Sequence, residues 1–414
     1  MNLADMLCYA DIDQLTRIAR TYDCGCGSHS KNELIQSILT VIQRRDALES
    51  RVEEMNADDL RFLNSLLFDT RASYSLEELK ARAGGMAADG TLVLKAAAEP
   101  NVPPAPPAQP AKGSRSRKKN AAAKAEQPET AEDAARQTIS RFKRYGWLFN
   151  GFSQQTRYLY QVPDDVKRRL CEALENRYSQ RLDVRQEPPA YRDERGLLAD
   201  DLVAFLRYVR DHDVPLTSEG YMYKRQLGQA LELMSVGEGV PGKAGWRFGY
   251  GRRFRDYPDR FSLLYDYAFH EGMIRENPDR LTVTEAGLAA AESPEPFDPA
   301  RLYRFWMRLY KKPVANLAAL VQWVARLAGS WTTVSSLYEV LQPIVRPYYY
   351  DQEKEVLELR VLRMMMHLGL LRWGETETGE TVVRMTPQGK AVVTGVNVPD
   401  RESQRWDDGV FPHV

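Results

Sequence analysis

Two stretches of the chain repeat one another, and this repeat constrains the fold more than any other feature. HEGMIRENPDRLTVTEAGLAAA covers residues 270–291, and HLGLLRWGETETGETVVRMTPQGKAVV covers residues 367–393. Each copy begins His-x-Gly, continues with two apolar residues and an Arg, and reaches Thr-x-x-Gly after a polar turn. The matched positions are His270, Gly272, Arg275, Thr284 and Gly287, and then His367, Gly369, Arg372, Thr386 and Gly389. Such a repeat indicates one supersecondary unit built twice.

The residue chemistry of each copy predicts a helix followed by a hairpin. The apolar spacing of FSLLYDYAFHEG and of VLELRVLRMMMHLG predicts a helix that ends at a Gly able to adopt left-handed backbone angles. Two strands follow, joined by the polar turns ENPDR and GETETGET. Thr284 and Thr386 suit the N-cap of a short closing helix, because a threonine hydroxyl accepts a backbone N–H. We expect His270 and His367 to lie at helix C-termini, where a histidine can serve the free carbonyls.

The segments upstream of both copies complete one order of elements. LLADDLVAFLRYVRD (197–211) predicts a helix, VPLT a short strand and YMYKRQLGQALELM a second helix. Before the second copy, VANLAALVQWVARLAG, SWTTV and SSLYEVLQPIV predict the same three elements. Helix, strand, helix, helix and hairpin is the element order of a winged helix. We therefore expect winged helices over residues 197–292 and 298–395.

A third copy is expected earlier in the chain. ADDLRFLNSLLF and SLEELKARA predict two helices, RQTISRFKRYGWLFNG a third that reaches Gly146, and TRYLYQVPDDV a strand of the wing. These segments form a split winged helix of residues 51–97 and 136–185. The Pro-, Ala- and Lys-rich residues 98–135 between them have no large apolar side chain after Val102, which predicts a disordered linker. Residues 396–414 form a C-terminal tail.

The N-terminal residues 1–50 predict two helices around a Gly-rich turn, with Ser30 and Glu33 as a capping box for the second helix. Two short helices joined in this way resemble the small modules called SAP-like or Rho-N-like, which often touch nucleic acid. A helical hairpin that packs on the next domain is an equal alternative. Cys24, Cys26 and His29 offer three ligands, but a structural zinc site needs four. We expect a turn here and no metal.

The composition limits both location and partners. Lys and Arg total 57, and so do Asp and Glu, so the net charge is zero. A neutral chain can still bind nucleic acid through a local basic face. The sequence contains no apolar run of the length that spans a membrane and no signal-peptide pattern at its start. Four cysteines are too few for a disulfide framework. We therefore expect a cytoplasmic protein.

The stretch GEGVPGKAG (237–245) approaches a phosphate-binding loop but fails one requirement. Gly237, Gly242 and Lys243 have the right spacing, but Ala244 stands where a Ser or Thr hydroxyl would bind magnesium. A predicted helix, not a strand, precedes the loop. Because the sequence also shows no nucleophile–base pair and no paired carboxylates, we expect no enzyme activity and no cofactor.

Three groups of basic residues are candidates for contact with DNA. The stretch GWRFGYGRRFRDYPDR (245–260) interleaves arginines with aromatic residues, which suits phosphate contact and base stacking. The alternative is that its arginines pair with Asp256 and Asp259. The second group lies on the helix that reaches Gly146, where the alternative is a solvated helix face. The third group lies at a predicted helix start. The candidates are Arg247, Arg252, Arg253, Arg255 and Arg260, then Arg141, Lys143 and Arg144, and lastly Lys224 and Arg225.

The stretches VPLTSEGYMYKRQLGQAL, HEGMIR and LTVTEAG together resemble the winged-helix region in the N-terminal segments of bacterial XPB-type helicases. The resemblance covers about residues 197–395. In that family the region accompanies a DNA-repair or transcription motor. Motor motifs are missing from this sequence, so the resemblance implies DNA binding or docking to a motor, without helicase activity.

Together these features predict a mainly α protein with small β-hairpins, built from tandem winged helices and an N-terminal helical hairpin module. The expected function is non-catalytic binding of double-stranded DNA in DNA repair or transcription. The alternative is a protein–protein docking scaffold for a helicase or the transcription machinery, and a remote third is an ATPase fragment. The sequence leaves the oligomeric state open.

Overall fold

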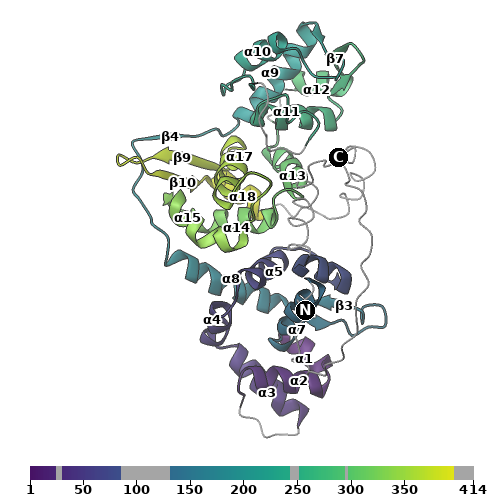
Figure 1. The fold of residues 1–414 in the computed structure, drawn as a ribbon, viewed down its shortest axis with the longest axis vertical. Helices are drawn as coiled ribbons and strands as arrows, with labels where there is room; N and C mark the ends of the chain where they lie inside the picture. Colours follow the sequence, from purple (N-terminus) through teal and green to yellow (C-terminus); the bar gives the residue numbers. More distant parts are fainter. Residues whose placement is uncertain (25–29, 85–130, 243–250, 294–296, 396–414) are drawn as a thin grey trace, which may run out of the picture. The chain divides into compact units, whose positions relative to one another are not determined.

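The computed structural model describes residues 1–24, 30–84, 131–242, 251–293 and 297–395. In these ranges the chain is mainly helical, with small antiparallel sheets (Figure 1), as the sequence predicts. The chain divides into two compact units, which we treat separately. Unit 1 contains residues 1–44 and 71–166, and unit 2 contains residues 45–70 and 167–414. None of the described helices is both long and apolar enough to cross a bilayer.

Unit 1 combines N-terminal helices with a small sheet. Helix α2 packs on α3 and α7, and α1 packs on α3. The sheet has the order β1-β3-β2, with Tyr74 opposite Tyr160 and Phe149 opposite Gln161. The elements are α1 (Leu3–Tyr9), α2 (Ile12–Thr21), α3 (Lys31–Ile42), β1 (Tyr74–Ser75), a helix over residues 76–84, α7 (Ala131–Arg144), β2 (Phe149–Asn150) and β3 (Leu159–Gln161).

Unit 2 opens with three helices and continues with a first module. The helices are α4 (Arg45–Glu53), α5 (Ala57–Leu67) and α8 (Asp164–Ser179), whose first residues belong to unit 1. The first module consists of α9 (Leu197–Asp211), β5 (Val214–Pro215), α10 (Lys224–Glu232), α11 (Asp259–His270), β6 (Ile274–Glu276), β7 (Arg280–Val283) and α12 (Glu285–Glu292). Its sheet has the order β5-β7-β6.

The second module of unit 2 repeats this order, with one extra strand. Figure 1 shows β9 and β10 as its hairpin, with β4 alongside β9. The sheet order is β4-β9-β10-β8. The elements are β4 (Ala190–Arg192), α13 (Pro299–Tyr310), α14 (Leu317–Leu327), β8 (Thr332–Thr333), α15 (Val334–Leu341), η1 (Gln342–Ile344), α16 (Glu353–Glu355), the π-helical η2 (Val356–Leu362), α17 (Arg363–His367), β9 (Leu371–Glu375), β10 (Thr381–Met385) and α18 (Pro387–Gly395).

The predicted order of helix, strand, helix, helix and hairpin is confirmed in both modules of unit 2. In each, the strand between the first two helices pairs with the second strand of the hairpin. Unit 1 shows the same pairing of β1 with β3. Its expected first helix, α5, belongs instead to unit 2, where it packs against η1 and α14. There the buried Asn64 Oδ1 accepts a hydrogen bond from Trp323 Nε1 at 2.6 Å.

A glycine ends the helix before the hairpin in all three places. The φ angles of Gly146, Gly272 and Gly369 are 66°, 66° and 70°, a left-handed conformation that favours glycine. The residue after each glycine donates its N–H to a carbonyl in the last turn of the helix. These hydrogen bonds are Trp147 N to Phe142 O (3.1 Å), Met273 N to Ala268 O (2.8 Å) and Leu370 N to Met365 O (2.9 Å). The shared geometry is a Schellman ending, which turns the chain from the helix into the hairpin.

The Thr-x-x-Gly of the two sequence copies also has a physical cause. Thr284 Oγ1 accepts from Gly287 N at 3.2 Å, and Thr386 Oγ1 accepts from Gly389 N at 2.9 Å, so both predicted N-caps are confirmed. A Cβ on Gly287 would lie 2.1 Å from Met273 O, and one on Gly389 would lie 2.0 Å from Leu370 O. The closing helix therefore rests on the backbone of the first hairpin strand, and only glycine fits the contact.

Several predicted boundaries are wrong. Residues 1–50 contain parts of four helices rather than two, because Asp11 caps α2 by accepting a hydrogen bond from Gln14 N at 2.6 Å and separates it from α1. Ser30 makes no side-chain hydrogen bond at the start of α3, so its predicted cap is absent. Helix α7 begins at Ala131, so residues 131–135 are helical. The rest of the predicted linker and the tail 396–414 lie outside the described residues.

Replacing Gly389 by alanine should destabilise unit 2 by about 1–3 kcal/mol, because the added methyl group overlaps a backbone oxygen that cannot move alone. Urea denaturation measures the change. Gly228→Ala is the matched control, because Gly228 lies in α10 with no atom within 4 Å of an added Cβ. It should leave stability unchanged or raise it by up to about 1 kcal/mol. Equal effects of the two substitutions would contradict the proposed backbone contact.

Candidate nucleic-acid interface

The third helix of the first module, α11, has almost no exposed side chain. Residues 260–268 are all buried. Reading of DNA by a winged helix requires the third helix to present polar side chains to the major groove. Helix α11 therefore cannot make the base contacts expected of it.

Arg260, predicted to contact DNA, lies inside unit 2. Its side chain is 1% exposed, and Nη1 lies 2.6 Å from Asp201 Oδ2 in an ion pair. Its Nε lies 3.5 Å from Glu194 Oε2, the oxygen that is also 2.9 Å from Nδ1 of the buried His367. Because this charge is enclosed by carboxylates, the prediction for Arg260 is wrong.

Glu194 is the centre of this buried cluster. Burial acts to raise its pKa, but the hydrogen bond with His367 and the charges of His367, Arg192 and Arg260 together hold the pKa below its ordinary value. His367 therefore does not serve helix-end carbonyls, as the sequence suggested, but a carboxylate contributed by another segment. His270 differs from it: its ring stacks on Phe305, and burial lowers its pKa to about 4, so it is neutral at pH 7.

The loop that resembles a phosphate-binding loop supplies a carboxylate to a helix start. Glu238 accepts hydrogen bonds from Arg260 N at 3.0 Å and from Phe261 N at 2.8 Å. These N–H groups belong to the first turn of α11, where a phosphate loop would place its phosphate. A carboxylate thus already occupies this anion position, and a helix, α10, precedes the loop. Lys243 and Ala244 lie outside the described residues.

Two arginines of the 245–260 stretch pair with the hairpin of their own module. Arg252 Nη2 and Arg253 Nη2 lie 2.5 Å and 3.0 Å from Glu276 Oε2. Arg253 also donates from Nη1 to Glu219 O at 2.9 Å. The alternative expectation of internal pairing is therefore confirmed for Arg252 and Arg253, whose partner is Glu276. The single carboxylate of Glu276 offsets half of the charge that these two arginines could offer to a phosphate.

The remaining candidates for DNA contact in unit 2 are not paired with a carboxylate of the described residues. Arg255 is exposed, with its guanidinium 5.6 Å from the ring centre of Phe254. Lys224 and Arg225 are exposed at the start of α10. Among the residues that the structure describes, these three side chains have no carboxylate partner. Arg247 lies outside those residues.

In unit 1, cationic side chains lie around the hairpin of β2 and β3. Lys143 on α7 donates from Nζ to Asn150 Oδ1 on β2 at 2.9 Å and lies 5.4 Å from the ring centre of Tyr160 on β3. Burial and the nearby charge of Arg17 lower the pKa of Lys143, while Asp11 acts to raise it. Arg144, next to Lys143, is exposed and has no ion-pair partner in the described part of the chain. Arg141 is half-buried on the same helix.

Aromatic side chains surround these cations, and the sequence analysis did not predict them as site residues. Tyr158 in the β2–β3 turn is 68% exposed, and the guanidinium of Arg157 lies 4.6 Å from its ring centre. Phe152, 45% exposed, stacks on Tyr9 of α1, 64% exposed. The stretch GFSQQTRYLYQ (151–161) contains both basic and aromatic residues, and this composition could have indicated the site. We call Arg17, Lys143, Arg144 and Arg157 the basic surface of unit 1.

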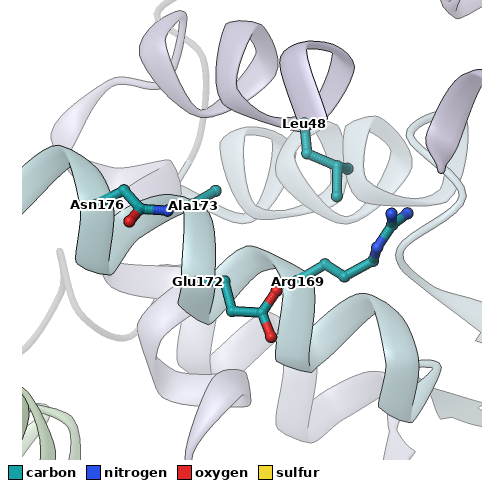
Figure 2. A pocket seen from close by; sticks show the side chains of 5 residues that line it. All are labelled: Leu48, Arg169, Glu172, Ala173 and Asn176. Atoms are coloured by element: carbon teal, nitrogen blue, oxygen red, sulfur yellow. The ribbon is translucent and has the colours of Figure 1, made fainter. Parts of the chain in front are cut away.

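A hollow in unit 2 offers little room for chemistry. Figure 2 shows its lining, with Leu48 on α4 and the other side chains on α8. The volume is about 170 Å³, below the roughly 300–1,000 Å³ typical of small-molecule sites. The lining residues are Leu48, Arg169, Glu172, Ala173 and Asn176.

Of the three candidate metal ligands that the sequence offers, only Cys24 lies among the described residues. Nowhere in the described ranges do three His, Cys, Asp or Glu side chains group as metal ligands would. Cys24 lies with its Sγ 3.9 Å from Ser37 O. Cys26 and His29 lie outside the described residues.

Comparisons with family models, with curated proteins and with solved structures gave no match. The resemblance to XPB-type helicase segments therefore stays a prediction.

Replacing Arg260 by methionine should destabilise unit 2 by about 3–5 kcal/mol, because Asp201 would remain buried without its cation and Glu194 would keep only Arg192 and His367. Arg255→Met, at an exposed position, should leave the melting temperature nearly unchanged. Thermal unfolding of both variants measures the difference. If Arg260→Met unfolds like the wild type, the buried cluster does not hold these elements together.

Replacing Asp266 by asparagine should flatten the dependence of stability on pH. Burial raises the pKa of Asp266 from 3.8 to about 7, although a hydrogen bond from Arg252 N opposes the shift. The unfolded chain loses this proton near pH 4 and the folded chain near pH 7. The wild type therefore loses up to about 4 kcal/mol of stability as pH rises through this window.

Asparagine keeps the acceptor for Arg252 N but cannot ionise, so Asp266→Asn should lose less stability between pH 4 and pH 7. Urea denaturation at several pH values measures this. Asp279→Asn, at an exposed position of the hairpin turn, should keep the wild-type profile. A wild-type profile for Asp266→Asn would refute the assignment.

Proposed function

We propose that this protein is a non-catalytic DNA-binding protein that contacts DNA through the basic surface of unit 1. The observation that carries the proposal is the contrast between two helices in matching positions. The C-terminal end of α7 places the exposed Arg144 and the half-buried Lys143 beside its hairpin, whereas α11 is buried and its Arg260 is enclosed by carboxylates.

The element order supports an interpretation of the repeated modules as winged helices. In each, the sheet brings the strand between the first two helices beside the second hairpin strand. On this interpretation α7 is the third helix of unit 1, and β2 and β3 form its wing. The third helix of a winged helix enters the major groove and the wing contacts the backbone. Lys143 and Arg144 then lie at the groove, and Arg157 lies on the wing.

The second module of unit 2 supports the choice of unit 1. Its third helix is formed by α16, η2 and α17, where three carboxylates, Glu353, Glu355 and Glu358, balance three cations, Lys354, Arg360 and Arg363. Two of these cations are paired, Lys354 with Glu358 and Arg360 with Asp259 and Asp351. A helix without an excess of unpaired cations is a poor contact for phosphates.

Unit 2 favours the second candidate function, a docking scaffold. The two modules are joined through their third helices, since Arg360 Nη1 of η2 lies 3.0 Å from Asp259 Oδ2 of α11. A unit tied together in this way presents a constant outer surface to a protein. From the resemblance, we propose a helicase or a transcription protein as its partner, and DNA repair or transcription as the process.

We also propose a cytoplasmic location. Cys8 and Cys171 are free thiols. Free thiols fit a reducing compartment, because proteins of oxidising compartments use cysteines mainly in disulfides.

The triple variant Lys143→Ala, Arg144→Ala and Arg157→Ala should weaken binding to duplex DNA of any sequence. Each lost phosphate contact should reduce the slope of log affinity against log salt by about 0.9, so the slope should fall by about 2–3. Fluorescence anisotropy at several salt concentrations measures both quantities. Thermal unfolding confirms that the variant remains folded.

The matched control removes three unpaired cations from unit 2, with Lys224→Ala, Arg225→Ala and Arg255→Ala. It should keep the wild-type affinity and slope. If this variant alone loses binding, the interface lies on unit 2. If the wild type shows no salt-dependent affinity for DNA, the DNA-binding proposal fails and the scaffold remains.

A further inference from the structure

A second hollow lies within unit 1, beside the basic surface. It opens between the start of α2 and the hairpin of β2 and β3, and its volume is about 320 Å³. This lies at the lower end of the range for sites that enclose a small molecule. Side chains that bear on its chemistry are Tyr9, Asp11, Gln14, Asn150, Phe152 and Arg157.

Two of these side chains form an aromatic wall. The rings of Tyr9 and Phe152 stack with their centres 4.3 Å apart and their planes 14° apart. Tyr9 is the last residue of α1 and Phe152 follows β2, and 64% and 45% of their surfaces are exposed. A flat, open aromatic stack of this kind can be extended by another flat ring. Bases of single-stranded nucleic acid stack on protein aromatics in this manner.

The polar lining contains an amide donor, Gln14, and a carboxylate acceptor, Asp11. Gln14 Nε2 has no hydrogen-bond partner among the described residues, so this amide keeps its capacity to donate to an acceptor atom of a ligand. Asp11 Oδ1 accepts from Gln14 N at 2.6 Å, which leaves its second oxygen free in the described part of the chain. An amide donor beside a carboxylate acceptor matches the Watson–Crick edge of a base.

The hollow is continuous with the cations that would hold the strand. Asn150 lines the hollow and accepts a hydrogen bond from Lys143, a member of the basic surface. Its Nδ2 donates to Arg157 O at 3.3 Å, and Arg157 itself lines the hollow. A phosphate held by Lys143 or Arg157 would therefore lie next to the opening, with its base directed inward.

We infer that this hollow receives one unstacked nucleobase, so that unit 1 binds DNA with a single-stranded segment in preference to blunt duplex. The inference rests on the proposed function and specifies its substrate class. In an intact duplex every base is stacked and paired, and turning one outward costs free energy. A fork or an overhang offers an unpaired base without that cost.

The test compares a blunt duplex, a fork with the same duplex length and a single-stranded oligothymidylate, using the full chain and fluorescence anisotropy at one salt concentration. The wild type should bind the fork and the single strand more tightly than the blunt duplex. Phe152→Ala should weaken fork binding about tenfold, through loss of one stacking contact. Gln14→Leu, which keeps the bulk but removes the donor, should also weaken fork binding, and neither should change affinity for the blunt duplex.

Tyr223→Ala is the matched control, because Tyr223 is 49% exposed and belongs to unit 2. It should bind all three DNAs as the wild type does. Equal wild-type affinity for fork and blunt duplex, together with an unaffected Phe152→Ala variant, would overturn the inference. If the triple variant of the basic surface still weakened both DNAs in that case, the proposed function would stand. Binding of free thymidine monophosphate as tight as that of the oligonucleotide would also overturn it.

Discussion

The ion cluster around Arg260 determines which surfaces of unit 2 remain available. A guanidinium that is 1% exposed is stable only when carboxylates surround it, and Asp201 and Glu194 provide them. Asp201 belongs to α9 and Glu194 to the segment before it, so the cluster pulls the start of α11 against the first helix of its module. His367 extends the cluster to the second module through the same Glu194 oxygen. Helix α11 is therefore structural, and a contact with a polyanion would have to be made by other elements.

The helix that precedes the hairpin differs in amphipathicity between the two units. In α11 the sequence FSLLYDYAFH has apolar residues all round, and a helix of that kind is buried on every side. In α7 the sequence AEDAARQTISRFKR leaves a polar face, with cations toward its C-terminal end. Both helices end in the same Schellman geometry, at Gly272 and Gly146. The backbone framework is thus constant, and the side chains decide whether the helix packs inside or faces solvent.

Local signals in the sequence predicted the modules well, because their causes are local. Thr386 caps α18 by accepting a hydrogen bond from Gly389 N, three residues later, and Gly369 reverses the chain within one turn. Arg260 could not be placed in the same way. Its partners lie many residues away in the sequence. The sequence of an aromatic stretch with basic residues is the same whether those residues are paired or free. The hollow of unit 1 escaped prediction for a similar reason, since Tyr9 and Phe152 meet only in the folded chain.

The zero net charge of the chain has a consequence for how DNA could be bound. A neutral protein gains little long-range attraction to a polyanion, so its affinity depends on cations that remain unpaired after folding. In the folded chain Arg252 and Arg253 pair with Glu276, and the carboxylates of the buried cluster enclose Arg260. None of these three arginines is therefore an unpaired cation. A few phosphate contacts give limited affinity and no preference among sequences. Stacking of a base in an aromatic hollow would add affinity that salt screens weakly, and it would add a preference for unpaired strands.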